Sequence, residues 1–442
     1  MEKLIVQGGK PLRGEIAVSG AKNVAMKAII AALLTEETIH IKNIPLISSV
    51  LGTARIITSL GAKINRTDHE LTISGKGVHK FQVPLELGGL YRTATMTIGP
   101  LLARFGKAVV PNPGGCRLGK RPVDWHIHAL EKMGATITYQ DGYFVAVAKQ
   151  LHGTKIEFAK NTHTGTETVI LAAVLAEGET VIENAAAEPE VDDLIRMLVT
   201  MGAEISRPKE RTIVISGVKK LHDTTYTIMP DRNEVVTFAI AAAATCGNVL
   251  IKGTQREYLT AFLQALDKAK VGWEAISADS TRFFVKGPIK PTNIISGPYP
   301  AFMTDWQQPW AVLTTLARGV SRIHETVFER RFSYVSELTK MGAKIKFYHP
   351  RVRNPDTFYN FNWQDRIPGY YQGVKIIGPT KLHDAILEMT DIRAGATLLV
   401  AALAATGTSV LTEVEHLDRG YEKLDERLKN LGADIKRIKE EL

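Results

Sequence analysis

Long apolar runs and cysteines are both scarce in this 442-residue sequence. The longest apolar stretches, Ala28–Leu34 and Leu398–Ala405, are far shorter than the ~18 residues that a bilayer-spanning helix needs. The chain contains 2 cysteines, Cys116 and Cys246, which exclude a disulfide framework and predict a protein of the reducing cytoplasm. No charged segment followed by an apolar one opens the sequence, so we expect no secretion signal.

Nucleotide-binding and zinc-binding signatures are also missing. No Walker or dinucleotide glycine pattern stands between a predicted strand and a predicted helix. His126 and His128 fall on different faces of a helix, without a cysteine or acid at metal-ligand spacing, so zinc is not expected. The formal net charge of +9 is scattered rather than grouped in blocks, which suits small anionic molecules as well as nucleic acid.

A short tag, Leu/Met-Gly-Ala, recurs about every 70 residues and indicates a repeated structural unit. Around each copy the order is an alanine-rich apolar helix, a β-branched strand, an amphipathic helix that ends at the tag, and two short strands. The tag glycine suits a helix C-terminal cap, and the apolar helices should be buried. The tag begins at Leu60, Met133, Met201, Met341 and Leu431, with a degraded copy around Gly272, and the apolar helices are predicted over 24–34, 94–103, 168–176, 235–244, 307–317 and 394–405.

Six such units predict two similar α/β domains, because three buried helices wrapped by three small sheets make one compact domain. We predict a first domain over residues 22–230 and a second over 231–442, completed by residues 1–21. An aromatic-rich insertion at about 347–372 lengthens the fifth unit. It either packs on its own domain or contacts a partner, a second copy or a membrane. Its aromatic residues are Phe347, Tyr348, Phe358, Tyr359, Phe361, Trp363, Tyr370 and Tyr371.

Charged residues gather where the helices of equivalent units begin. A cation at a helix N-terminus is unfavourable by roughly 0.3–1 kcal/mol, so its repeated placement there indicates a function. Backbone N–H groups and arginine side chains together bind phosphate and carboxylate, which predicts a site for a small, multiply charged anion. These residues are Lys22, Asn23, Arg92, Thr164, Asp231, Arg232, Asp305, Asp391 and Arg393 before the first helices, and Arg117, Lys120, Arg121, Arg330, Arg331, Asp418 and Arg419 before the second.

A glycine-rich basic loop over residues 111–124 carries Cys116. Nearby cations lower a thiol pKa, so Cys116 is a candidate nucleophile or proton donor. Cys246 stands in an apolar stretch and is expected to be an ordinary core residue. Asp305 and Asp391 are candidates for two roles, as helix N-caps or as bases beside the cationic site.

Eight segments together resemble the UDP-N-acetylglucosamine enolpyruvyl transferases over essentially the whole chain. The resemblance implies a two-domain inside-out α/β barrel of six βαβαββ units, three per domain. It also implies transfer of the enolpyruvyl group of phosphoenolpyruvate to the 3-hydroxyl of UDP-N-acetylglucosamine, without metal or other cofactor, as the first committed step of peptidoglycan precursor synthesis. The segments are GAKN (20–23), YRTA (91–94), PGGCRLGKRPVD (113–124), PDRNEVVTF (230–238), TDWQQ (304–308), ETVFERRF (325–332), TDIRAGA (390–396) and HLDRGYE (416–422).

The resemblance also implies a role for individual residues. Cys116 corresponds to the proton donor to the methylene carbon, Asp305 to the base at the sugar hydroxyl, and Asn23 and Asp391 to residues beside the tetrahedral intermediate. The phosphoenolpyruvate-binding residues would be Lys22, Asn23, Arg121, Arg331, Arg393 and Arg419. The nucleotide-sugar-binding residues would be Arg92, Arg121, Pro122, Val123, Asp124, Trp125, Lys160, His163, Thr164, Asp305 and Val327.

One segment departs from the family pattern. Where relatives commonly read Ser-Val-Gly-Ala-Thr, this chain has His163–Glu167, with one extra residue after Lys160. This departure leaves open a paralogue that uses a different hydroxyl acceptor. A nucleic-acid-binding or RNA-processing protein is the remaining alternative, because RNA-cyclase folds use similar units, but only the insertion offers stacking aromatics. We therefore expect small-molecule substrates, no nucleic acid and no membrane span, and leave the oligomeric state open.

Overall fold

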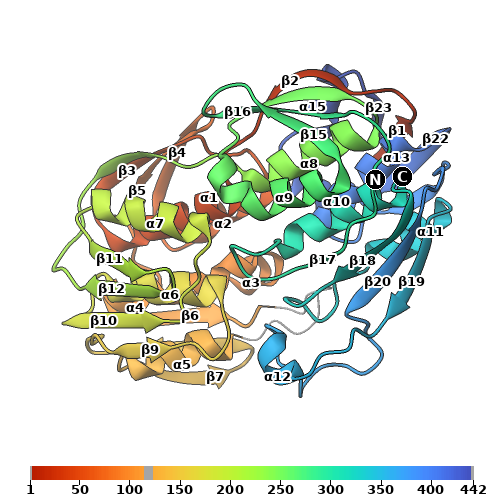
Figure 1. Cartoon of the computed structure of the whole chain (residues 1–442). Helices are drawn as coiled ribbons and strands as arrows, with labels where there is room; N and C mark the ends of the chain where they lie inside the picture. The colour runs from red at the N-terminus through yellow and green to blue at the C-terminus, as the bar shows by residue number, and fades with distance from the viewer. Residues whose placement is uncertain (1, 114–122, 440–442) are drawn as a thin grey trace. The chain divides into compact units, whose positions relative to one another are not determined.

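The computed structural model describes residues 2–113 and 123–439 and has a mixed α/β architecture, which confirms the predicted class (Figure 1). The chain divides into two compact units. The first unit comprises residues 20–113 and 123–229, and the second comprises residues 2–19 and 230–439. In the described part of the chain, no helix is long and apolar enough to cross a membrane.

The first unit contains three small sheets within its described residues. In β3 (Thr38–Lys42), Ile39 and Ile41 are buried and His40 between them is exposed, which is the period-two pattern of a strand with one face on a core. The sheet orders are β13-β3-β5-β4, β11-β12-β10-β9 and β6-β8-β7. The other strands are β4 (Lys63–Thr67), β5 (Glu70–Ser74), β6 (Lys107–Pro111), β7 (Thr136–Gln140), β8 (Tyr143–Val147), β9 (Lys155–Glu157), β10 (Glu179–Glu183), β11 (Glu204–Lys209), β12 (Thr212–Ser216) and β13 (Thr224–Thr227).

The second unit contains three four-stranded sheets in its described residues, each with one parallel and two antiparallel pairings. The amino-terminal strand β1 (Glu2–Gln7) lies between β22 and β23 and buries Leu4 and Val6. The orders are β21-β22-β1-β23, β15-β16-β14-β2 and β17-β18-β20-β19. The strands are β2 (Arg13–Ala17), β14 (Asn248–Lys252), β15 (Val271–Ala275), β16 (Ser280–Val285), β17 (Ile294–Ile295), β18 (Gly319–His324), β19 (Lys344–Tyr348), β20 (Gly373–Gly378), β21 (Ile386–Glu388), β22 (Thr408–Thr412) and β23 (Asp434–Lys439).

The alanine-rich helices are buried, as their composition predicts. In the second unit α8, α10 and α13 pack against one another, and in the first unit α4 packs against α6. Helix α6 begins at His163 and not at Thr168, and α10 begins at Thr304 and not at Gln307. The apolar pattern missed these starts because the first turns of both helices are polar. These helices are α1 (Lys22–Ala31, continued by η1, Ala32–Leu34), α4 (Ile98–Phe105, preceded by η2, Arg92–Thr97), α6 (His163–Ala173), α8 (Arg232–Ala244), α10 (Thr304–Thr315) and α13 (Ile392–Ala404).

The amphipathic helices end at the repeated tag, and the tag glycines adopt the left-handed conformation that caps a helix. Gly61 has φ 109° and Gly202 has φ 97°. In the degraded copy Lys270 takes this conformation with φ 62°, and Gly272 lies in β15. The helices are α2 (Ser48–Ser59), α5 (Asp124–Lys132), α7 (Pro189–Thr200), α9 (Thr260–Ala269), α11 (Tyr334–Lys340) and α15 (Leu424–Asn430), and the short ones are α3 (Leu85–Leu90), η3 (Arg256–Leu259), α12 (Pro355–Phe358) and α14 (Glu415–Asp418).

The expectation that Cys246 is a core residue is wrong, because its side chain is exposed. Helix α8 ends at Ala244, and Cys246 follows with a left-handed φ of 53°. A residue in that conformation turns the chain away from the helix. The apolar composition of the stretch therefore reflects the buried helix before the cysteine and not the cysteine itself.

Candidate active site

In the second unit, Asp305 lies between two buried arginines. Asp305 is in the first turn of α10, and its Oδ1 accepts a hydrogen bond of 2.6 Å from Arg331 Nη2. Its Oδ2 accepts one of 3.1 Å from Arg393 Nε. The side chains of Arg331 and Arg393 are 3% and 6% exposed, whereas that of Asp305 is 26% exposed. The cluster therefore presents a carboxylate to solvent and keeps the cations that hold it inside.

Arg393 has a second buried partner in Tyr421. Arg393 Nη1 donates a 2.7 Å hydrogen bond to the Tyr421 hydroxyl, which also lies 2.8 Å from the Thr237 hydroxyl. Burial opposes the charge on Arg393, but Tyr421 and Asp305 outweigh it and raise the pKa of Arg393 above its ordinary value. For Tyr421 the effect of burial has the other sign. Burial disfavours the charged phenolate and raises the pKa of Tyr421, which outweighs the opposing effect of Arg393. The Arg393 guanidinium thus stays charged and fixed in orientation.

The turn over residues 325–331 is held from within by Glu325. The buried Glu325 carboxylate accepts hydrogen bonds from the backbone N–H groups of Val327 (2.8 Å) and Phe328 (3.0 Å), and from the Thr304 hydroxyl (2.8 Å). At the other end of this turn, the Arg331 carbonyl accepts hydrogen bonds from the side chains of Gln307 and Gln308, both on α10. Val327 and Arg331 thus belong to the same short turn, and their positions depend on how this turn is held.

Asp391 is a helix N-cap, one of the two roles that the sequence left open. Its Oδ1 accepts hydrogen bonds from the backbone N–H groups of Arg393 (2.9 Å) and Ala394 (3.0 Å) at the start of α13. Its Oδ2 accepts one of 3.2 Å from Ser333. The N-cap of α10 is Met303, and Asp305 is the second residue of the helix. Arg419 lies directly after α14 and is half-buried.

In the first unit, the predicted residues again stand at helix starts. Lys22 and Asn23 begin α1 and Arg92 begins η2, and all three are half-buried. His163 and Thr164 begin α6, where the Thr162 hydroxyl caps the helix by accepting from the Gly165 backbone N–H. The remaining predicted residues are Val123 (buried, before α5), Asp124 (exposed) and Trp125 (half-buried) at the start of α5, and Lys160 (half-buried) before α6.

Lys27, His163 and Glu167 form a buried ion cluster at the start of α6, which the sequence did not predict. Glu167 is fully buried, with Oε2 lying 3.1 Å from Lys27 Nζ and Oε1 lying 3.1 Å from His163 Nε2. The Lys27 side chain is 3% exposed and that of His163 is 24% exposed. The available signal was one charged residue inside each of two apolar helices, which indicates a buried pair.

Burial opposes a charge on His163, and Lys27 repels it. The carboxylate of Glu167 outweighs both, with support from Glu188, and raises the pKa of His163 above its ordinary value of 6.5. On the neighbouring residue, the Thr164 hydroxyl lies 2.9 Å from His126 Nε2 on α5. The start of α6 is thus held by two other segments of the first unit, α1 and α5.

Some of the predicted site falls outside the described residues, namely Cys116, Arg117, Lys120, Arg121 and Pro122. Among residues 2–113 and 123–439, no His, Cys, Asp or Glu side chains form a group of three that could hold a metal ion. The structure does bring together Asp305, Arg331 and Arg393 in one unit.

The family of this chain is decided by comparison with known proteins. The sequence profile of EPSP synthase (3-phosphoshikimate 1-carboxyvinyltransferase) matches residues 6–428. The chain belongs to this family of carboxyvinyl transferases. Two similar carboxyvinyl transferases are both named UDP-N-acetylglucosamine 1-carboxyvinyltransferase. The protein from Geotalea uraniireducens is 42% identical over 442 residues, covering 100% of both chains, and that from Acidobacterium capsulatum is 41% identical over 442 residues, covering 99% of this chain and 96% of its own.

Solved carboxyvinyl transferases share the fold. The enolpyruvyl transferase NikO from Streptomyces tendae is 24% identical with a TM-score of 0.86, covering 99% of this chain and 98% of its own. An EPSP synthase from Acinetobacter baumannii is 19% identical with a TM-score of 0.74, covering 99% of this chain and 100% of its own.

Proposed function

We propose that this protein transfers the enolpyruvyl group of phosphoenolpyruvate to the 3-hydroxyl of UDP-N-acetylglucosamine and releases phosphate. The observation that carries the proposal is the full-length identity of 41–42% to relatives named for this reaction. The reaction is the first committed step of peptidoglycan precursor synthesis, and we assign it to the cytoplasm. A cluster of one solvent-facing carboxylate and two buried arginines suits chemistry that needs a base beside a bound anion.

The proposed mechanism is addition followed by elimination. In the addition step, Asp305 takes the proton of the sugar 3-hydroxyl while the hydroxyl oxygen bonds to C2 of phosphoenolpyruvate. Cys116 gives a proton to the methylene carbon. The product is a tetrahedral ketal that carries the phosphate, with Asn23 and Asp391 beside it. In elimination, the C2–O bond to phosphate breaks and the new methyl group loses a proton, which restores the double bond.

Lys22, Arg121 and Arg419 would bind the phosphate, and Arg331 and Arg393 the carboxylate. Both arginines donate hydrogen bonds to Asp305, which hold its carboxylate in place. A substrate carboxylate at these arginines would share their charge and weaken their hold on Asp305. Binding of phosphoenolpyruvate would therefore leave the Asp305 carboxylate freer to meet the sugar hydroxyl at the step where that hydroxyl loses its proton.

The architecture proposed for this chemistry is a two-domain inside-out α/β barrel of six βαβαββ units. We assign three units to residues 22–230 and three to residues 231–442 with 1–21. The similar strand pairing of the sheets in both units and the buried alanine-rich helices support this division. The nucleotide sugar is assigned to Arg92, Arg121, Pro122, Val123, Asp124, Trp125, Lys160, His163, Thr164, Asp305 and Val327.

The acceptor is the part of the proposal that has a rival. His163 and Glu167 form an ion cluster where the common family pattern has uncharged residues, which favours a paralogue with another hydroxyl acceptor as the second candidate. Phosphate release from phosphoenolpyruvate, measured across a panel of acceptors, separates the two. Turnover with UDP-N-acetylglucosamine supports the first candidate, and turnover only with a different acceptor selects the paralogue.

The role of Cys116 is tested by thiol alkylation. Because Cys246 is exposed and would also react, the experiment uses a Cys246→Ser background. Alkylation should then abolish turnover, and bound substrates should protect against it. Full activity after complete labelling would remove Cys116 from the mechanism.

A further inference from the structure

The aromatic insertion packs on its own unit. Residues 349–372 connect β19 to β20, whose final pair is Tyr348 opposite Gly373. Tyr359, in the middle of the insertion, is 1% exposed, and its hydroxyl lies 3.0 Å from Nε2 of His324 at the end of β18. Burial lowers the pKa of His324 to about 4, so this contact is between neutral side chains at physiological pH.

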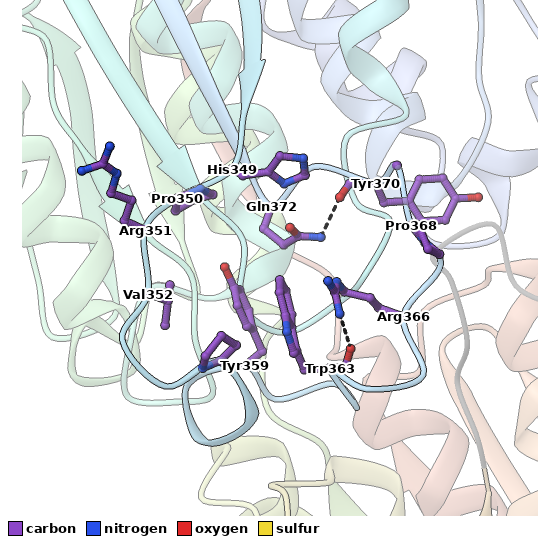
Figure 2. A pocket seen from close by; sticks show the side chains of 12 residues that line it. His349, Pro350, Arg351, Val352, Tyr359, Trp363, Arg366, Pro368, Tyr370 and Gln372 are labelled. Carbon is purple, nitrogen blue, oxygen red and sulfur yellow. Dashed lines mark hydrogen bonds between the residues drawn. The ribbon is translucent and has the colours of Figure 1, made fainter.

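Aromatic and cationic stacking makes the insertion a compact block. Figure 2 shows the indole of Trp363 between the ring of Tyr359 and the guanidinium of Arg366. The two rings are 4.5 Å apart and 7° from parallel, and the Arg366 guanidinium carbon lies 3.8 Å from the indole centroid. Arg366 Nη1 also donates a 2.9 Å hydrogen bond to the Trp363 carbonyl. Tyr359, Trp363 and Arg366 thus stack on one another, and together they form part of the wall of the pocket in Figure 2.

One side of this block is joined to the turn over residues 325–331. The contacts involve residues 325, 326, 329 and 330 of the turn, and two of them use its backbone, so they restrict where the turn lies and not only its side chains. The Glu325 N–H donates to the Gln372 carbonyl (2.8 Å), the Asn360 N–H donates to the Thr326 carbonyl (2.7 Å), the Ile367 N–H donates to the buried Glu329 carboxylate, and the Arg330 guanidinium carbon lies 5.2 Å from the Tyr370 ring centroid.

The two ends of the turn are held differently. Arg331 is fixed by α10 through Asp305, Gln307 and Gln308, without the insertion. Residues 325–330, which contain Val327, are held by the Glu325 carboxylate, by Ser296 and by the insertion. The Ser296 hydroxyl accepts a hydrogen bond from the Thr326 N–H (3.0 Å), and the Ser296 carbonyl accepts one from the Thr326 hydroxyl (2.6 Å). Loss of the insertion should therefore loosen residues 325–330 more than Arg331, which α10 holds.

We propose that the insertion is a positioning element for the acceptor substrate, which fixes the turn so that Val327 meets the nucleotide sugar. This inference rests on the proposed function, in which Val327 contacts the acceptor and Arg331 contacts phosphoenolpyruvate. The insertion itself touches neither substrate in this scheme and acts through the backbone of the turn.

The main test replaces residues 349–372 by Asn-Gly, a dipeptide that closes two-residue hairpins. Because Tyr348 and Gly373 are already paired, the β19–β20 register is kept. The KM for the nucleotide sugar should rise by about tenfold to a hundredfold, as expected for a misplaced binding group, with the KM for phosphoenolpyruvate nearly unchanged. Unchanged values in a folded variant, or an equal rise in both, would overturn the proposal.

A second variant guards against poor folding of the shortened chain. Tyr370→Leu removes the ring beside Arg330 and should raise the KM for the nucleotide sugar about two- to fivefold, whereas Tyr370→Phe keeps the ring and should behave as wild type. Gln364→Ala is the control, because this exposed side chain bonds to Asp356 within the insertion. Equal effects of the leucine and phenylalanine variants would contradict the proposal.

Hydrogen–deuterium exchange keeps the inference separate from the proposed function. Peptides over residues 325–331 should exchange faster in the hairpin variant and at the wild-type rate in Gln364→Ala, whatever the substrate is. Unchanged exchange in the hairpin variant would overturn the inference even if the enzyme is active. Absence of wild-type turnover with both substrates would refute the proposed function and leave the exchange result to decide the inference.

Discussion

The Asp305 cluster of the second unit and the Glu167 cluster of the first unit each pair one carboxylate with two basic side chains, but they differ in which group is exposed. In the second unit the carboxylate is 26% exposed and its two arginines are buried. In the first unit the carboxylate is fully buried, Lys27 is buried beside it, and His163 is the member that is 24% exposed. Asp305 is in the first turn of the buried helix α10, and His163 is the first residue of the buried helix α6, with Glu167 one turn further along.

This difference separates two chemical tasks. A solvent-facing carboxylate can accept a proton from a substrate, whereas a solvent-facing imidazole on a buried carboxylate can donate a hydrogen bond to an anion. The helix start supplies the same scaffold for both. In the proposed mechanism, one helix start therefore holds a base and the other holds a cation that binds an anion, with a different partner buried in each.

The largest effect that sharpens the comparison is expected from Asp305→Asn. The amide keeps the size of the carboxylate but cannot act as a base, so kcat should fall by about 10²–10⁴-fold. The KM for phosphoenolpyruvate should change little, because both arginines remain. Steady-state phosphate release measures both quantities.

The matched control is Asp425→Asn. Asp425 is another carboxylate of the second unit that pairs with an arginine, Arg437 at 3.2 Å, but unlike Asp305 it is buried. It should lower the melting temperature and leave kcat as in wild type. A similar loss of kcat in both variants would mean that the Asp305 cluster is structural only, like that of Asp425.

In the first unit, substitution of the cluster carboxylate should change the stability of the protein rather than kcat. Glu167→Gln leaves the Lys27 charge buried without its counterion, which should lower the free energy of unfolding by about 3–5 kcal/mol. Urea unfolding followed by circular dichroism measures the change. The double variant Lys27→Met/Glu167→Gln removes both charges and should recover most of the loss. No difference between the single and double variants would show that the pair is not coupled.

The sequence predicted the class of fold and the positions of many candidate residues, because both follow from short-range patterns. Alanine-rich runs identified the buried helices, and the tag glycines identified where the outer helices end. The starts of α6 and α10 were predicted too late, because polar first turns carry no apolar periodicity.

Partners that meet through the fold could not be predicted. Lys27 and Glu167 are far apart in sequence, as are Arg393 and Tyr421, and no local pattern specifies either pair. The exposure of Cys246 depends on a single left-handed residue after a helix, which composition does not reveal. The role of the insertion likewise depends on backbone contacts with a turn that precedes it in the chain.

Tyr421→Phe tests how far the second unit depends on the buried side of its cluster. The change leaves Arg393 Nη1 and the Thr237 hydroxyl without a hydroxyl partner, so the free energy of unfolding should fall by about 1–3 kcal/mol. The KM for phosphoenolpyruvate should rise by a smaller factor than the kcat loss of Asp305→Asn. An unchanged stability would show that the hydroxyl does not orient Arg393.

The smallest expected effect is the pH dependence of acceptor binding through His163. Its raised pKa lies above 6.5, so the imidazolium and its contribution to stability are fully present below about pH 6.5 and are lost as the pH rises through the folded-state pKa. The facing charges are Glu167, Lys27 and Glu188, which raise, lower and raise the pKa of His163 respectively.

Because a charge-assisted hydrogen bond exceeds a neutral one by about 1 kcal/mol, the KM for the nucleotide sugar should rise about fivefold across this titration. The quantity to measure from about pH 6 to about pH 9 is the KM for the nucleotide sugar divided by the KM for phosphoenolpyruvate. This ratio cancels the effect of groups whose titration changes both KM values. His163→Asn should flatten that ratio and abolish the matching fall in stability. A ratio that is already flat in wild type would mean that the exposed member of the first-unit cluster does not bind the acceptor, and the two clusters would then no longer divide the chemistry between them.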